Sequence, residues 1–240
     1  MNDSMSDPRI ADPQGTAAQG TAAQGTEAQA ADPQDAEAQP TADTRAALIA
    51  HARRAFASEG YTGASIRRIT SEAGANLGAV TYYFGSKRQL YAEVLVAVLG
   101  PLRERVLAAA AASGSGLERV TGVVRAFFAH LAANPDQPGL MLQEIASGRV
   151  PPDPARDIIR SVFGTVAGLV RQGQTDGTIR PGDPALLALS AVAQPVYLSL
   201  VRRLTSPVLD LALQDDPERV VEHAVTFVRR GLAPEAGDPS

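Results

Sequence analysis

Residues 44 to 90 read TRAALIAHARRAFASEGYTGASIRRITSEAGANLGAVTYYFGSKRQL, and this stretch decides the fold of the chain. Its pattern predicts three short helices and the start of a fourth, with a tight glycine-containing break between the second and third. Two helices set at an angle by a turn of about 3–4 residues have the geometry that fits the DNA major groove. We therefore interpret the rest of the chain as support for this stretch or as control over it.

Capping residues and glycines set the limits of these helices. Gly60 is expected to supply a left-handed C-cap to the first helix, Asn76 to cap the third and Ser86 to cap the fourth. The predicted helices run from Asp43 or Thr44 to Ser58, from Ala64 or Ser65 to Gly74, from Leu77 to Tyr83, and from Lys87 to about Ala110.

The pattern stays helical to the end of the chain, and no convincing strand alternation is present. We expect an all-α protein: a three-helix DNA-binding head with a helix-turn-helix, and a helical-bundle body for ligand binding and dimerisation. The further helices are expected near 116–133, 138–148, 153–174, 183–204 and 217–232. The expected domains are a tail at 1–42, the head at 43–90, the body at 91–232 and a flexible end at 233–240.

Residues 1–42 carry a pentad repeat, GTAAQ-GTAAQ-GTEAQ, and almost no large apolar side chain. Such a composition cannot offset the entropy cost of ordering, so it predicts a disordered acidic tail. Two interpretations stay open. The tail is a spacing or autoinhibitory arm, or it is a low-complexity leader without consequence.

Charge is distributed unevenly. The whole chain has a net charge of -4, yet residues 44–88 hold seven Arg or Lys against Glu59 and Glu72. A basic module on an otherwise acidic protein is typical of a phosphate-binding face.

Several classes of protein find no support in the sequence. The chain has no cysteine, which excludes disulfides and thiolate chemistry, and its three histidines lack metal-binding spacing. We expect no metal, no cofactor and no enzymatic activity. Residues 184–201 approach membrane length, but prolines and polar residues dilute them, so we predict a buried bundle helix in a cytoplasmic protein without a membrane partner.

Candidate DNA contacts gather in the second and third helices. Ser65 and Arg67 can bind a phosphate together, although an ordinary cap followed by a solvated arginine has the same sequence. Gly78 and Ala79 are small enough to let a helix approach a groove. Three successive residues with hydroxyl groups follow: Thr81, Tyr82 and Tyr83. Their hydroxyl groups can contact DNA, or one or two of the tyrosine rings can instead fill the core. Lys87, the only lysine, begins a helix. A phosphate bound there would interact favourably with both the helix dipole and the lysine ammonium group.

These residues lie within two recognisable motifs. They are F-A-x-E-G-Y-x-G-x-S-I-R-x-I at residues 56–69 and A-G-A-N-x-G-A-V-x-Y-Y-F-G-S-K-x-x-L at residues 73–90. The stretch resembles the N-terminal domain of TetR-family transcriptional regulators. The resemblance implies a homodimer that binds a palindromic double-stranded DNA operator, usually as a repressor released by a small molecule.

Carried over by position, the resemblance assigns roles to individual residues. Ser65 and Arg67 match contacts of the second helix, and Tyr83 and Lys87 match phosphate contacts. The reading surface is matched by Leu77, Gly78, Ala79, Thr81 and Tyr82. Leu77, Thr81 and Tyr83 differ from the residues common in the family, so base preference cannot be transferred.

The body offers a weaker pattern. Apolar residues that could line a cavity for a largely apolar effector are Phe127, Phe128, Leu131, Met141, Leu142, Phe163, Val166, Val170 and Tyr197. Polar residues that could anchor it are His130, Gln143, Glu144, Arg171 and Gln194. Plain core packing is the alternative for each. By analogy with the family, the last two helices are the expected dimer interface.

Two functions remain as hypotheses. The first is a ligand-responsive dimeric repressor, with a ligand-independent or activating regulator as a variant of it. The second is a helical ligand- or partner-binding protein without specific DNA readout. The size of the preference for specific over non-specific DNA at physiological salt would distinguish them.

Overall fold

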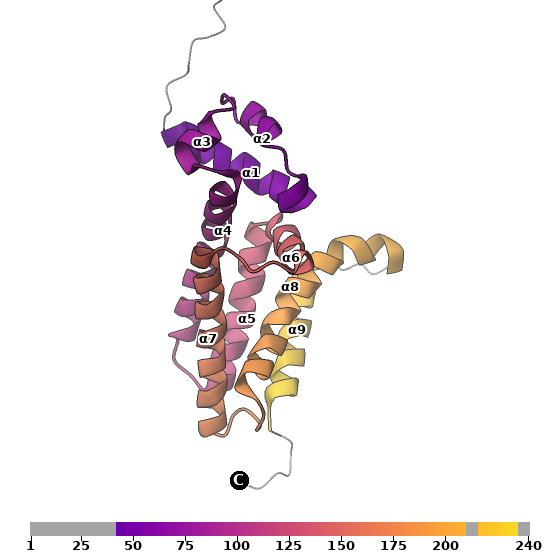
Figure 1. Cartoon of the computed structure of the whole chain (residues 1–240). Coiled ribbons are helices and arrows are strands. Elements are labelled where there is room, and N and C mark those ends of the chain that lie inside the picture. The colour runs from indigo at the N-terminus through magenta and orange to yellow at the C-terminus, as the bar shows by residue number, and fades with distance from the viewer. Residues whose placement is uncertain (1–41, 210–215, 235–240) are drawn as a thin grey trace, which may run out of the picture. The chain divides into compact units, whose positions relative to one another are not determined.

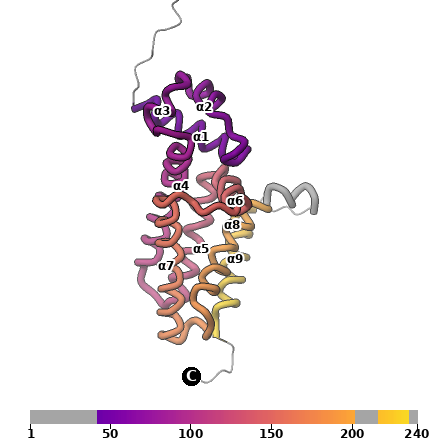
Figure 2. The backbone as a smooth tube through the Cα atoms, in the orientation of Figure 1, coloured from indigo at the N-terminus to yellow at the C-terminus, as the bar shows by residue number. Residues whose placement is uncertain are grey.

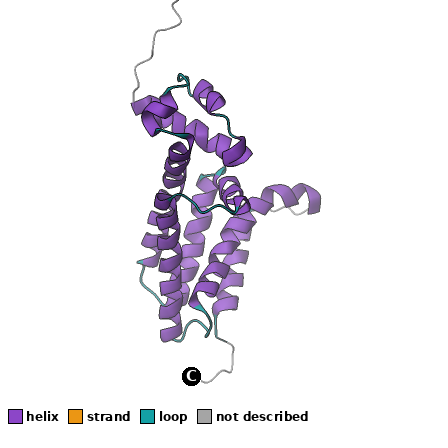
Figure 3. Ribbon diagram, viewed as in Figure 1, coloured by secondary structure: helices purple, strands orange, loops and turns teal. Residues whose placement is uncertain are grey.

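The computed structural model describes residues 42–209 and 216–234, with side chains described except at 202–209. The predicted acidic tail lies outside these residues apart from Ala42, and so does most of the predicted C-terminal segment. The described residues form helices joined by loops, with no strand among them (Figure 3). The predicted all-α fold is confirmed.

The head consists of α1 (Ala42–Gly63), α2 (Ile66–Glu72) and α3 (Ala79–Phe84). The first helix was predicted to stop at Ser58, but helical turns continue to Gly63 beyond a kink at Gly60. Gly60 has φ 69° and ψ 176°, a backbone region open essentially to glycine alone, rather than the left-handed helical conformation that we expected.

The third helix begins two residues later than predicted. Gly78, not Asn76, is its N-cap, and the amide of Ala79 bonds the carbonyl of Asn76 at 3.1 Å. Residues 77 and 78 therefore form a turn before the helix. This shift changes which residues of α3 face outward.

The long helix α4 (Lys87–Ala110) has the predicted limits, and the Ser86 hydroxyl accepts a hydrogen bond from the Gln89 amide at 3.2 Å. It leads from the head into the body (Figure 2). The remaining helices are α5 (Gly116–Ala133), α6 (Gln137–Ser147), α7 (Asp153–Thr175), α8 (Pro184–Leu209) and α9 (Pro217–Leu232).

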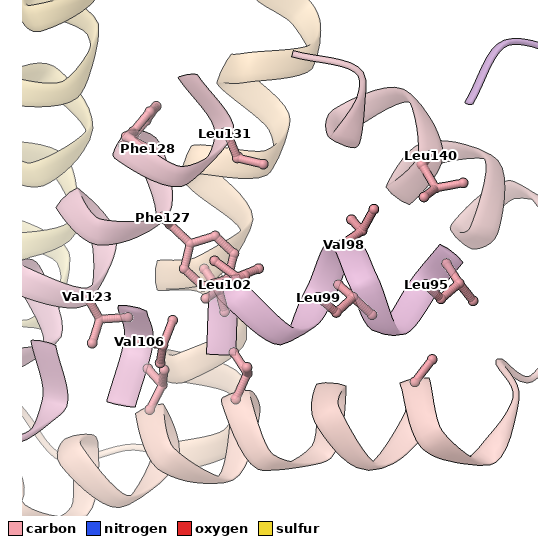
Figure 4. Close-up of a cluster of buried hydrophobic side chains, with 14 of the residues drawn as sticks. Leu95, Val98, Leu99, Leu102, Val106, Val123, Phe127, Phe128, Leu131 and Leu140 are labelled. Atoms are coloured by element: carbon pink, nitrogen blue, oxygen red, sulfur yellow. The ribbon is translucent and has the colours of Figure 1, made fainter. Parts of the chain in front are cut away.

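Head and body share one hydrophobic core, because α1 packs on both α4 and α6 (Figure 1). Arg53 of α1 also pairs with Asp136, just before α6, at 2.6 Å. Within the body, apolar side chains of α4, α5 and α6 gather in one cluster (Figure 4). The position of the head therefore depends on how α6 packs.

Helix α8 is only partly buried. Its window Pro184–Val201 is long and apolar enough to cross a membrane by length and composition, and 28% of that window is buried. Leu187, Ala188 and Val192 pack into the core, whereas Leu189 and Tyr197 are exposed. The prediction of a buried bundle helix is therefore wrong for one face of α8.

Candidate nucleic-acid interface and body cavity

One face of the third helix and of the turn before it is open to solvent. Tyr82 is 71% exposed and Leu77 54% exposed, and Gly78 and Thr81 are exposed beside them. Val80 and Phe84 hold the opposite side of α3 in the head core. The exposed face carries a phenol, a hydroxyl and an apolar side chain, which can contact phosphates and thymine methyl groups.

Two of the predicted reading residues lie elsewhere. Ala79 is 8% exposed and belongs to the head core, so its expected outward position is wrong. Ala79 is the first residue of α3, and it lies with Val80 on the side of the helix that packs into the head core. Tyr83 is half-buried against the same core, with its ring 5.1 Å from that of Tyr82 in an edge-on arrangement.

The cations of the head fall into two groups. Carboxylates pair with Arg45, Arg53 and Arg68, which leaves less free positive charge than the sequence suggested. Among the described residues, no carboxylate lies within salt-bridge distance of Arg54, Arg67, Lys87 or Arg88, and Arg54 contacts the His51 ring instead. Arg67, Lys87 and Arg88 are therefore the cations of the head best placed to attract phosphate.

Ser65 occupies the N-cap position of α2, and its side chain makes no capping hydrogen bond there. Ser65 and Arg67 are both exposed. The hydroxyl group and the guanidinium are thus available to an external acceptor such as a phosphate oxygen.

Lys87 is held against an aromatic ring. Its Nζ lies 4.9 Å from the centroid of the Tyr61 ring and donates to the Thr62 carbonyl at 3.4 Å. The Arg149 guanidinium carbon lies 4.8 Å from the same centroid, and Arg149 Nη1 donates to Thr62 Oγ1 at 3.5 Å. Burial first, and the nearby charge of Arg149 second, lower the pKa of Lys87.

The body holds a cavity of about 390 Å³. Its walls come from α4, α5, α6, α7 and α8 and are almost entirely apolar. The predicted residues found on its walls are Phe127, Met141, Leu142, Phe163 and Tyr197. The α4 residues Leu95, Val98, Leu99 and Leu102 also line it and were not among the predicted cavity residues.

Four of the predicted apolar residues do not line this cavity. Phe128 and Leu131 border a smaller pocket of about 90 Å³ between α5, α8 and α9. Val166 and Val170 are buried in the bundle core. These predictions are wrong because a helical repeat marks an apolar face without showing whether that face meets a neighbouring helix or a void.

Glu144 is the charged residue on the cavity wall. The Tyr91 hydroxyl donates to Glu144 Oε2, while Glu144 Oε1 is buried with no hydrogen-bond partner in the described part of the chain. Burial first, and this hydrogen bond second, raise the pKa of Tyr91. The connection links the cavity to α4 at the level of the head, because the Tyr91 ring packs on Phe56 and Tyr61.

The other predicted polar anchors lie away from the cavity wall. His130 is buried and bonds Gln137 through Nε2 and Oε1 at 2.6 Å, and burial lowers its pKa. Gln143, Arg171 and Gln194 are not on the wall either. Among the described residues, no cluster of three His, Asp or Glu side chains could hold a metal ion.

Comparison with known proteins gives the head a sequence family. Residues 48–94 match the family described as bacterial regulatory proteins, tetR family. The chain is 33% identical over 84 residues to the HTH-type transcriptional regulator BetI of Rhizobium meliloti, a match that covers 35% of this chain and 41% of BetI. It is 40% identical over 53 residues to the HTH-type transcriptional repressor AcnR of Corynebacterium glutamicum, covering 22% of this chain and 28% of AcnR. The chain thus matches less than half the length of these curated relatives.

The fold extends further than these sequence matches. The crystal structure of a bacterial regulatory protein in the tetR family from Rhodococcus RHA1 superposes with a TM-score of 0.68 at 21% identity, over 80% of this chain and 98% of that one. A helix-turn-helix head on a helical body defines the class of all-helical DNA-binding proteins. Residues 48–94 thus carry a domain of the tetR family, and the described helices of head and body have the fold of a solved tetR-family structure.

Proposed function

We propose that the chain is a dimeric, sequence-specific DNA-binding repressor that a small, largely apolar molecule releases from a palindromic operator in the cytoplasm. The observation that carries this proposal is the exposure of Leu77, Thr81 and Tyr82 in a head whose cations Arg67, Lys87 and Arg88 have no carboxylate partner among the described residues. Sequence similarity of the head to a curated repressor supports the same direction of regulation.

The effector is proposed to occupy the body cavity. A volume of about 390 Å³ suits a small organic molecule, and its walls favour an apolar skeleton. Residues Leu140, Met141, Leu142 and Ile145 of α6 all border this space, and α6 also packs on α1 of the head. Occupancy of the cavity would therefore shift α6 and, through it, the two heads of a dimer relative to each other.

The dimer contact is proposed to lie on the exposed face of α8 and α9. Leu186, Leu189 and Tyr197 project from α8 and Phe227 from α9, all more than half exposed. Other apolar residues of these two helices, Val192, Val225 and Val228, are buried within the subunit and are not part of this surface. An apolar surface of this kind is typical of subunit contacts.

A mobility-shift assay with DNA from upstream of the gene tests the proposal. Tyr82→Ala should weaken specific binding by about 5- to 150-fold, because a lost base contact costs about 1–3 kcal/mol. Leu107→Ala, which shortens an exposed apolar side chain on the body end of α4, is the control and should leave the affinity for DNA unchanged. Absence of binding at low salt, or equal binding by wild type and Tyr82→Ala, would refute the proposed function.

A further inference from the structure

The contact of Arg149 with the head is unlike the other ion contacts between head and body. Arg53 meets a carboxylate across that boundary, whereas Arg149 lies against the same aromatic ring as Lys87. Both Lys87 and Arg149 lie within 5 Å of the Tyr61 centroid, and neither forms a salt bridge among the described residues. Two like charges held together are stabilised when an anion binds both.

The surroundings of this pair are those of a phosphate site. Arg149 is exposed, and its long 3.5 Å hydrogen bond to Thr62 leaves most guanidinium donors available. Thr62 lies three residues before Ser65, the N-cap of α2 whose hydroxyl makes no capping bond. A guanidinium, an ammonium and a hydroxyl group are the groups that proteins use to bind DNA phosphates.

Resting on the function proposed above, we propose that Arg149 is a DNA-backbone contact supplied by the body, and that Arg149 and Lys87 bind a phosphodiester group together beside Tyr61. Sequence comparison of the head could not find it, because Arg149 lies far beyond residues 48–94. The contact adds affinity without sequence preference, since it reaches the backbone and no base.

The position of Arg149 also gives the contact a regulatory consequence. It follows Gly148, the left-handed C-cap of α6, and lies between two residues of the cavity wall, Ile145 and Pro151. A molecule that displaces α6 thereby displaces a DNA contact directly. Loss of that contact would accompany any change in the spacing of the two heads.

The test is the salt dependence of DNA affinity, measured without effector on full-length protein. Each phosphate contact contributes about 0.9 to the slope of log Kobs against log salt, so Arg149→Gln should lower the slope by about 0.9. By the same relation it should weaken binding roughly eightfold at 0.1 M salt, equally for operator and random DNA. Arg149→Lys, which keeps the charge, should retain most of the wild-type slope.

Arg171→Gln is the matched control, because this exposed arginine of α7 lies next to Gln172 and Gly173, which contact the first turn of α5 rather than the head. Its slope should equal that of wild type. If wild type binds its operator and Arg149→Gln keeps the full slope, this inference fails while the proposed function stands. If wild type does not bind DNA, the proposed function fails first.

Discussion

At Gly116, α5 and α7 lie so close together that adding one methyl group should have a large effect on stability. A Cβ added at Gly116, the first residue of α5, would lie 2.3 Å from the Gly173 Cα of α7 and 2.8 Å from the Leu169 carbonyl oxygen. Non-bonded carbons prefer about 3.5–4.0 Å, so Gly116→Ala must push α5 and α7 apart by an ångström or more. Overpacking of this kind costs about 1–3 kcal/mol.

That cost should be visible in unfolding. For a protein of this size about 1 kcal/mol corresponds to 2–4 °C, so Gly116→Ala should lower Tm by about 2–12 °C. Gly122→Ala in the same helix is the matched control, because no neighbouring atom lies within 4 Å of its added Cβ. Alanine is the better helix former, so this control should be neutral or stabilising by up to about 1 kcal/mol. Urea and thermal unfolding followed by circular dichroism measure both variants, and equal stability of the two would refute the packing argument.

Two further perturbations follow from buried polar groups. Tyr91→Phe removes the hydroxyl that donates to Glu144 and should lower the free energy of unfolding by about 1–3 kcal/mol, whereas Tyr82→Phe at an exposed position of the head should stay within about 0.5 kcal/mol in urea titrations. Burial lowers the pKa of His130, so the unfolded chain takes up a proton first as the pH falls. Stability should therefore decrease below about pH 6.5, and unfolding titrations of His130→Gln across that range should show a smaller decrease, an unchanged pH dependence being the contrary result.

Helix limits could be predicted wherever local chemistry sets them. Ser86 after Gly85 gave the start of α4, and Ser115 with Glu118 forms a capping box at the start of α5, whose predicted range also agrees. The start of α3 was predicted wrongly because Asn is a common N-cap residue, whereas the N-cap of α3 is Gly78 rather than Asn76. Capping preference identifies candidates, and tertiary packing chooses among them.

Cavity residues are harder to predict, because a helical repeat shows which face of a helix is apolar but not what that face packs against. Phe163 and Val166 lie three residues apart on α7, yet the first lines the cavity and the second is buried in the core. The difference depends on where α5 and α8 stand, which no local pattern specifies. The approach of Arg149 to Lys87 is likewise set by the packing of α6 on α1 and carries no local sequence signal.

The role of α6 follows from how little else connects the cavity to the head. Apart from α4, which spans both, α6 is the helix that both packs on α1 and supplies cavity walls. A ligand can shift an equilibrium only by its differential affinity for two states, so the states must differ where the ligand touches. α4 is fixed by many buried side chains along its length, whereas α6 has few, with Leu140 the most buried of its apolar side chains. Movement of α6 therefore costs less packing energy than movement of α4. Helix α6 also holds Glu144, which accepts a hydrogen bond from Tyr91, and Arg149 lies two residues beyond its last residue. Substitutions that uncouple effector from DNA should accordingly cluster in α6 and the residues after it.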